Sequence, residues 1–138
     1  MPKNILKNLD GLTPDESAKL LELERSVALD DARPNITNNF LSFVKYVWPE
    51  FIEGSHHKII NKKFNDLAEG KIKRLIINMP PRHTKSEFAS YLLPAWMIGK
   101  NPKLKIIQAT HTADLAIDFG RKTTNFVDQE NYRELFPT

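Results

Sequence analysis

The chain has 138 residues, of which 41% are hydrophobic and 27% charged, a composition typical of one folded domain with a modest core. The absence of cysteine excludes a disulfide scaffold and a thiolate metal site. The net charge of +3 permits contact with nucleic acid without requiring it. No apolar run approaches the roughly 20 residues of a membrane span and the N-terminus lacks an apolar signal region, so we expect a cytoplasmic protein without a membrane partner.

The N-terminal part is predicted to be helical. The capping sequence Thr13–Glu16 follows a polar arm and predicts a helix that runs to about Leu29. The proline in residues 33–35 predicts a linker, because proline removes a backbone donor and biases the residue before it away from helix. We therefore expect an arm and helix in residues 1–35 and a separate domain in residues 36–138.

The second part alternates predicted helices and strands. Apolar residues at helical spacing predict helices over 37–48, 55–67 and 85–98, and a further helix capped by Thr110 or Thr112. Pro94 predicts a kink or an early end within the third of these. Short β-branched runs predict strands over 73–79 and 104–109, and their near-continuous apolar character is typical of a parallel sheet. The expected fold class is α/β.

The loop between the first strand and the next helix has the outline of a phosphate-binding loop. Lys85 would reach the β- and γ-phosphates of a nucleotide, and the Ser86 hydroxyl would ligate Mg²⁺. The Walker A pattern has glycine where Met79 and Thr84 stand, and a surface connection that contains Lys-Ser by chance is the alternative. The strand before the loop and the helix after it favour phosphate binding. The predicted contacts to the nucleotide are Pro81, Arg82, His83, Thr84, Lys85 and Ser86.

Several separated motifs together resemble the ATPase domain of the large terminase subunits of tailed phages, the motors that package DNA. The motifs are Asn78–Glu87, Pro94-Ala95-Trp96, Asp114-Leu115-Ala116 and Phe119-Gly120-Arg121. The resemblance implies a RecA-like P-loop NTPase fold with a parallel sheet, and ATP and Mg²⁺ as cofactors. It also implies double-stranded DNA, a portal protein and a small terminase subunit as partners, a homo-oligomeric ring, and a phage-encoded protein in the host cytoplasm.

The resemblance extends to individual residues. The family's loop commonly begins Pro-Pro-Arg, so Met79 is an ordinary variant, whereas most relatives have glycine at the position of Thr84. The Thr84 backbone is therefore either ordinary or strained. Arg82 is expected to stabilise charge on the transferred phosphoryl group as an arginine finger does, with a solvated loop arginine or an ion pair to Glu87 as the alternative. His57 lies in the family's adenine-contact segment, with helix capping or surface placement as the alternative.

An ATPase of this kind also needs an aspartate to hold Mg²⁺ and a glutamate to activate water, at the end of a later strand. Neither predicted strand ends in Asp-Glu, and the carboxylates of a terminase nuclease domain are missing. We therefore expect this chain to be the ATP-binding, N-terminal part of the ATPase domain, which does not hydrolyse ATP alone. The resemblance also implies that its two strands lie on either side of the position of the missing strand that carries the acidic pair. A non-catalytic remnant or protein-interaction module is the alternative, and an unrelated P-loop kinase or helicase fits the motifs less well.

Overall fold

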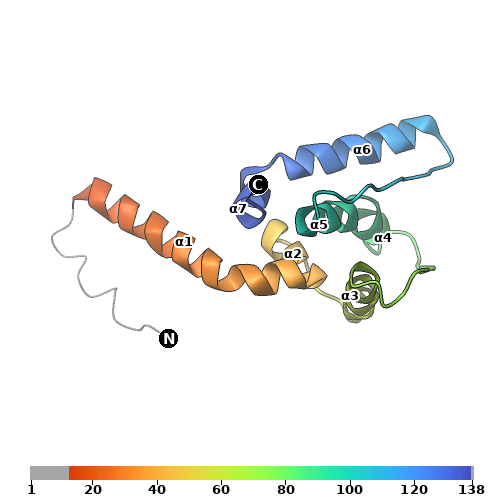
Figure 1. The fold of residues 1–138 in the computed structure, drawn as a ribbon, viewed down its shortest axis with the longest axis horizontal. Coiled ribbons are helices and arrows are strands. Elements are labelled where there is room, and N and C mark those ends of the chain that lie inside the picture. The colour runs from red at the N-terminus through yellow and green to blue at the C-terminus, as the bar shows by residue number, and fades with distance from the viewer. Residues whose placement is uncertain (1–12, 138) are drawn as a thin grey trace. The chain divides into compact units, whose positions relative to one another are not determined.

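The computed structural model describes residues 13–137, which fall into two compact units, one ending at Pro34 and one beginning at Asn35. Figure 1 shows the helical elements in chain order. They are α1 (Pro14–Asn38), α2 (Phe40–Val47), α3 (Ser55–Ala68), α4 (Lys85–Glu87), the π-helical turn η2 (Phe88–Leu92), α5 (Leu93–Lys100), α6 (Ala113–Val127) and α7 (Glu130–Leu135).

The first unit consists mainly of α1, which begins at the predicted capping sequence. The backbone N–H of Glu16 donates to Thr13 Oγ1 at 3.3 Å, and the backbone N–H of Thr13 donates to Glu16 Oε2 at 2.9 Å. The helix does not end near Leu29 as expected, but continues through Pro34 to Asn38. Proline has a φ close to the helical value and removes a single donor, so a helix can continue through it where the following residues are held.

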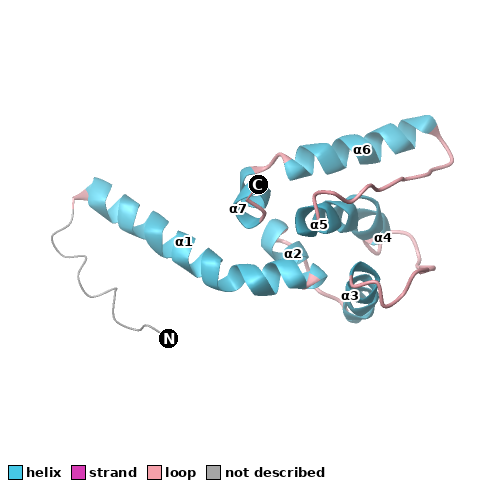
Figure 2. Cartoon of the chain, viewed as in Figure 1, coloured by secondary structure: helices cyan, strands magenta, loops and turns pink. Residues whose placement is uncertain are grey.

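The predicted parallel sheet is wrong, and the RecA-like P-loop fold with it. Residues 13–137 contain helices and loops but no strand (Figure 2). Leu75, Ile77 and Met79 are half-buried and alternate with exposed residues, among them Ile76 at 86% exposure. This two-residue period is that of an extended chain with one covered face. A strand also needs a neighbouring strand to pair its backbone groups, and neither predicted strand has one in the described part of the chain.

Phe40 lies at the centre of the aromatic core of the second unit. Its ring makes edge-to-face contacts with Phe64, Phe88 and Trp96, at centroid distances of 5.0, 5.3 and 5.6 Å. All four rings are at most 1% exposed. The Trp96 Nε1–H donates to the carbonyl of Thr37 at 2.9 Å, so the buried indole keeps a polar partner. This core joins α2, α3, η2 and α5, and it holds the helices on either side of the predicted phosphate loop.

Two asparagines of α3 cap the start of α2. The first N–H groups of a helix have no partner within it. Here the N–H of Phe40 donates to Asn65 Oδ1 at 3.2 Å, and that of Leu41 donates to Asn61 Oδ1 at 2.8 Å. The N-cap residue Asn39 accepts from the N–H of Ser42 at 3.1 Å. These bonds fix α3, which lies before the candidate site, against α2.

The helical run from Lys85 to Lys100 contains the irregularity that Pro94 predicts. The run passes through the π-helical turn η2 before Pro94, which has no N–H to donate to the carbonyl of Ser90. Gln108 Nε2 donates to that carbonyl at 3.0 Å and so replaces the missing helix donor. The loop between α5 and α6 is thereby joined to the middle of the helical run.

The C-terminal helix α7 lies against α5. The Tyr132 hydroxyl donates to the Ala95 carbonyl at 2.7 Å in a buried contact. A Cβ atom on Gly99 would lie 2.6 Å from the ring of Phe136, closer than packed atoms approach, so the absence of a side chain at Gly99 permits this contact. The α7 segment therefore closes the side of the core formed by α5.

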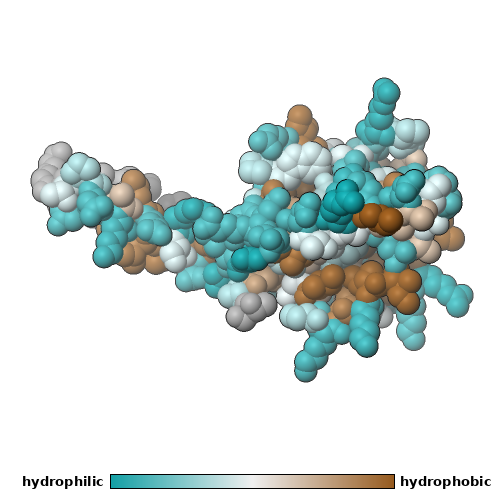
Figure 3. Space-filling model, turned by 90° about the horizontal axis from the view of Figure 1, so that it is seen from above, coloured by the Kyte–Doolittle hydropathy of each residue, from teal (hydrophilic) through white to brown (hydrophobic). Residues whose placement is uncertain are grey.

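Apolar side chains also remain at the surface, where they form the brown areas of the space-filling view (Figure 3). In the second unit the large exposed ones are Ile52, Ile59, Ile76, Ile106, Ile107 and Ile117. Of the helices in residues 13–137, none combines the length and the apolar character needed to cross a bilayer.

Candidate functional site

The predicted phosphate loop has an unusual backbone. Arg82 and Thr84 have φ values of 64° and 55°, and they are the two non-glycine residues with positive φ in the described part of the chain. Thr84 is left-handed at φ 55°, ψ 12°, immediately before the helical run that begins at Lys85. A β-branched residue is disfavoured in this conformation, at a cost of about 1–3 kcal/mol. Of the two alternatives for Thr84, the structure therefore has the strained one.

A chain of hydrogen bonds holds Thr84 in place. His57 Nδ1 accepts from the backbone N–H of Gly54 at 2.8 Å, so the ring proton of neutral His57 resides on Nε2. Nε2 lies 2.7 Å from Thr84 Oγ1 and donates to it, and the Thr84 hydroxyl donates to the carbonyl of His83 at 2.7 Å. Each donor in this series of hydrogen bonds, from Gly54 to the carbonyl of His83, has an acceptor. The loop is thus bonded to the first turn of α3.

His57 is nearly enclosed, at 5% exposure, and its ring lies 4.8 Å from that of Phe51 and 5.1 Å from that of Phe88. Burial lowers the pKa of His57, and the neighbouring imidazoles of His56 and His83 lower it further, while Glu53 opposes them. His57 is therefore neutral at pH 7, as the hydrogen bond from Gly54 requires.

Lys85 closes the loop on itself. Its ammonium group donates at 3.3 Å to the carbonyl of Met79, the last residue of the extended segment 75–79, on the opposite side of the loop. The side chain is half-buried, so the charge lies over the loop rather than in bulk solvent. A lysine held above a loop in this way is a ready cation for an anion bound by the loop.

The other predicted contacts lie at the surface of the loop. Pro81, Arg82, His83 and Ser86 are exposed or half-buried. His83 Nδ1 lies 2.9 Å from the Pro81 carbonyl, which makes the loop compact. Within residues 13–137, no ion pair joins Arg82 to Glu87. The structure therefore brings His57, Thr84 and Lys85 together around the loop. The side chains of Arg82 and Ser86 are held in place by no hydrogen bond or ion pair to another described residue.

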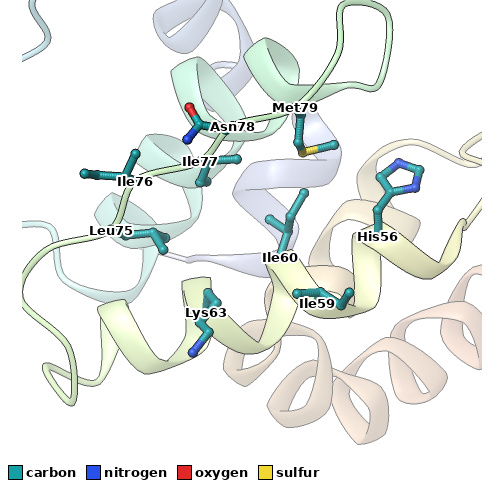
Figure 4. Close-up of a pocket in the computed structure, with 9 residues that line it drawn as sticks. All are labelled: His56, Ile59, Ile60, Lys63, Leu75, Ile76, Ile77, Asn78 and Met79. Carbon is teal, nitrogen blue, oxygen red and sulfur yellow. The ribbon is translucent and has the colours of Figure 1, made fainter.

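An apolar groove of about 360 Å³ adjoins the loop, between α3 and the extended segment (Figure 4). Met79 belongs to both, since its side chain lines the groove and its carbonyl accepts from Lys85. The buried Nε2 of His56, at one end of the groove, has no hydrogen-bond partner among the residues that the structure describes. Lys63 and Asn78 add polar groups to the lining of the groove. The lining residues are His56, Ile59, Ile60, Lys63, Leu75, Ile76, Ile77, Asn78 and Met79.

Sequence interpretation missed the anchoring of Thr84 by His57. Gly54 and His57 occupy the N-cap and N3 positions of α3, and His57 supplies the half of a capping box that glutamate usually supplies. That spacing is a local signal for capping. The contact from His57 to Thr84 spans 27 positions, and no local pattern predicts it.

Among residues 13–137, no three or more histidine, aspartate or glutamate side chains gather as metal ligands would. Comparison with known proteins found no matching family model, no matching curated protein and no matching solved structure.

Proposed function

We propose that the loop Pro81–Ser86 binds the phosphates of ATP with Mg²⁺. We further propose that the chain is the ATP-binding part of a DNA-packaging motor of the large terminase type. The observation that carries this proposal is the closed loop itself: two residues with positive φ precede a helical run, and Lys85 lies over the loop against the Met79 carbonyl. The proposal depends on this local geometry and requires no sheet.

The residues of the loop fit the chemistry of a triphosphate. The first N–H groups of the helical run that starts at Lys85 have no carbonyl one turn earlier within that run, so they are donors for phosphate oxygens. Lys85 exchanges its bond to Met79 for a bond to the β- and γ-phosphates. In this proposal the exposed hydroxyl of Ser86 ligates Mg²⁺, and the exposed Arg82 contacts the γ-phosphate. Bound Mg²⁺ supplies neutralisation of the phosphate charge.

The groove beside the loop suits the base of the same nucleotide. Its walls are largely aliphatic, which favours the faces of a purine, and the imidazole of His56 lines one end of it. His57 has both ring nitrogens engaged within the protein, so in this arrangement the adenine contact passes from His57 to His56.

The larger role rests on the sequence resemblance to terminases. There, ATP turnover by a ring of subunits moves double-stranded DNA through a portal, with a small terminase subunit as a further partner. The exposed Lys73 and Arg74, near the loop in sequence, are suited to phosphate backbones. Water activation requires a paired carboxylate and a Mg²⁺-binding aspartate. We propose that this chain supplies the phosphate-binding half of the site and does not hydrolyse ATP by itself.

A second candidate is a protein-interaction module without nucleotide chemistry. The exposure of Ile76 at 86% and Ile107 at 96% favours it, because exposed apolar groups of this size suit contact with another protein. The two candidates differ in whether the chain binds ATP.

The test is calorimetric titration of the 138-residue chain with Mg²⁺ and ATP. We expect Lys85→Ala to weaken binding by roughly ten- to a hundredfold, the value of a charge-assisted hydrogen bond. Lys62→Ala is the matched control, because Lys62 is an exposed lysine of α3 that does not line the groove. Equal affinity of Lys85→Ala and the parent contradicts the proposal, and no binding by any of the three proteins favours the interaction module.

A further inference from the structure

The phosphate loop contains a residue whose conformation needs an outside support. Glycine adopts positive φ without steric cost, whereas the Cβ branch of threonine opposes it. Thr84 nonetheless has φ 55°, and its neighbour Arg82 has φ 64°. The hydrogen bonds within the loop, from Thr84 Oγ1 to the adjacent His83 carbonyl and from Lys85 to the Met79 carbonyl, move with the loop, so they do not tie this backbone to the rest of the second unit.

The support comes from α3. His57 Nε2 lies 2.7 Å from Thr84 Oγ1, and the opposite nitrogen of the ring is bonded to the N–H of Gly54 at the start of the helix. The ring also packs against Phe51 and Phe88. His57 therefore cannot follow a movement of the loop, and it transmits the rigidity of the core to Thr84.

We infer that His57 is a positioning residue for the phosphate loop, and that the His57–Thr84 pair replaces the glycine that the Walker A pattern has at this position. Threonine supplies the hydroxyl that glycine lacks, and the histidine holds that hydroxyl where the left-handed backbone places it. The consequence for nucleotide affinity rests on the proposed function. The positioning of Thr84 does not.

The hydrogen bonds from Gly54 to His57 and from His57 to Thr84 form together only when the ring of His57 is neutral. A second proton on Nδ1 would face the N–H of Gly54, and two donors cannot bond to each other. The titratable groups around the ring are Glu53 before α3, His56 beside it and His83 in the loop. Glu53 favours the protonated ring, whereas burial and the two imidazoles oppose it, so the anchor is complete at neutral pH.

The first experiment needs no nucleotide. Nitrogen-15 NMR of the full chain should show His57 protonated on Nε2 and unprotonated on Nδ1, and residue 84 should show the strong intraresidue HN–Hα NOE of a positive φ. Thr84→Val keeps the branched side chain but removes the hydroxyl, so this NOE should weaken. Thr84→Ser, the matched control, keeps the hydroxyl and should retain it. A proton on Nδ1, or an unchanged NOE in Thr84→Val, overturns the inference.

The second experiment is a double-mutant cycle read by ATP affinity. His57→Ala should weaken binding roughly five- to tenfold when residue 84 is threonine, the value of one hydrogen bond. In the Thr84→Gly background the same change should have an effect of less than about twofold, because glycine needs no support. Equal losses in the two backgrounds overturn the inference. Should His57→Ala unfold the core, Thr84→Val removes the same hydrogen bond from the loop side and its ATP affinity is measured instead. Absence of ATP binding in every variant counts against the proposed function. The NMR result still decides whether His57 positions Thr84.

Discussion

Gly99 tests how tightly α5 and the C-terminal segment are fitted together. A Cβ at Gly99 would lie 2.6 Å from Cδ2 and Cε2 of Phe136 and 2.7 Å from its Cγ. The ring has little room to retreat, since it lies 5.0 Å from the ring of Tyr132 and 6.0 Å from that of Phe43. Gly99→Ala must therefore displace Phe136 from an aromatic cluster.

Two opposing effects set the size of the change. Overpacking of a filled site costs about 1–3 kcal/mol. Alanine is a better helix former than glycine by about 1 kcal/mol. We expect Gly99→Ala to lower the free energy of unfolding by about 1 kcal/mol overall. In the Phe136→Ala background the clash is absent, so the same substitution should raise the free energy of unfolding by about 1 kcal/mol.

The assay is urea denaturation followed by the fluorescence of the two tryptophans, of which Trp96 is buried, and by circular dichroism. Gly120→Ala in α6 is the control, because a Cβ added at Gly120 would have no neighbouring atom within 4 Å and only the helix-propensity gain should remain. The reasoning is refuted if Gly99→Ala stabilises the parent, or if its effect has the same sign and size in the Phe136→Ala background.

Two pH dependences follow from the buried side chains. The pKa of His57 is lowered from its ordinary 6.5, so the unfolded chain takes up the proton first, and the free energy of unfolding should fall as pH drops below 6.5. Urea denaturation from about pH 7.5 to 5.5 should show this slope, and His57→Gln should flatten it; an unchanged slope excludes His57 as its source. Burial raises the pKa of Tyr132 from 10.0 to about 12, so the contribution of its neutral hydroxyl to the free energy of unfolding is full below pH 10 and declines between pH 10 and 12. Tyr132→Phe should remove this alkaline decline, and a decline that persists would assign it to other groups.

The helices of the second unit could be predicted because their signals are local. The expected helix over 55–67 corresponds to α3, and the run after the loop contains its irregularity next to Pro94. Of the two capping threonines, the structure uses Thr112, whose Oγ1 accepts from the N–H of Leu115 at 3.4 Å. A cap and a period of 3.6 are properties of neighbouring residues, so the sequence carries them directly.

The lack of a sheet in the described residues could not be predicted in the same way, because strand pairing depends on a second segment. The runs around Ile76 and Ile107 have the composition of strands, yet each lies without a backbone partner in the described residues. The bond from His57 to Thr84 is equally non-local. The residue types of the candidate site were therefore predictable, whereas the left-handed loop and its support from α3 were not.

The two extended segments have a consequence for the behaviour of the chain at high concentration. Each exposes isoleucine, Ile76 in one and Ile107 in the other, on backbone that is not paired with another strand in the described residues, and this is the combination that lets strands of different molecules join into aggregates. Both are flanked by exposed positive charge, Lys73-Arg74 before the first, and Lys103 and Lys105 around the start of the second. Repulsion between these charges opposes alignment of identical segments, so the basic residues act as gatekeepers of solubility, and their protection should weaken as salt screens them.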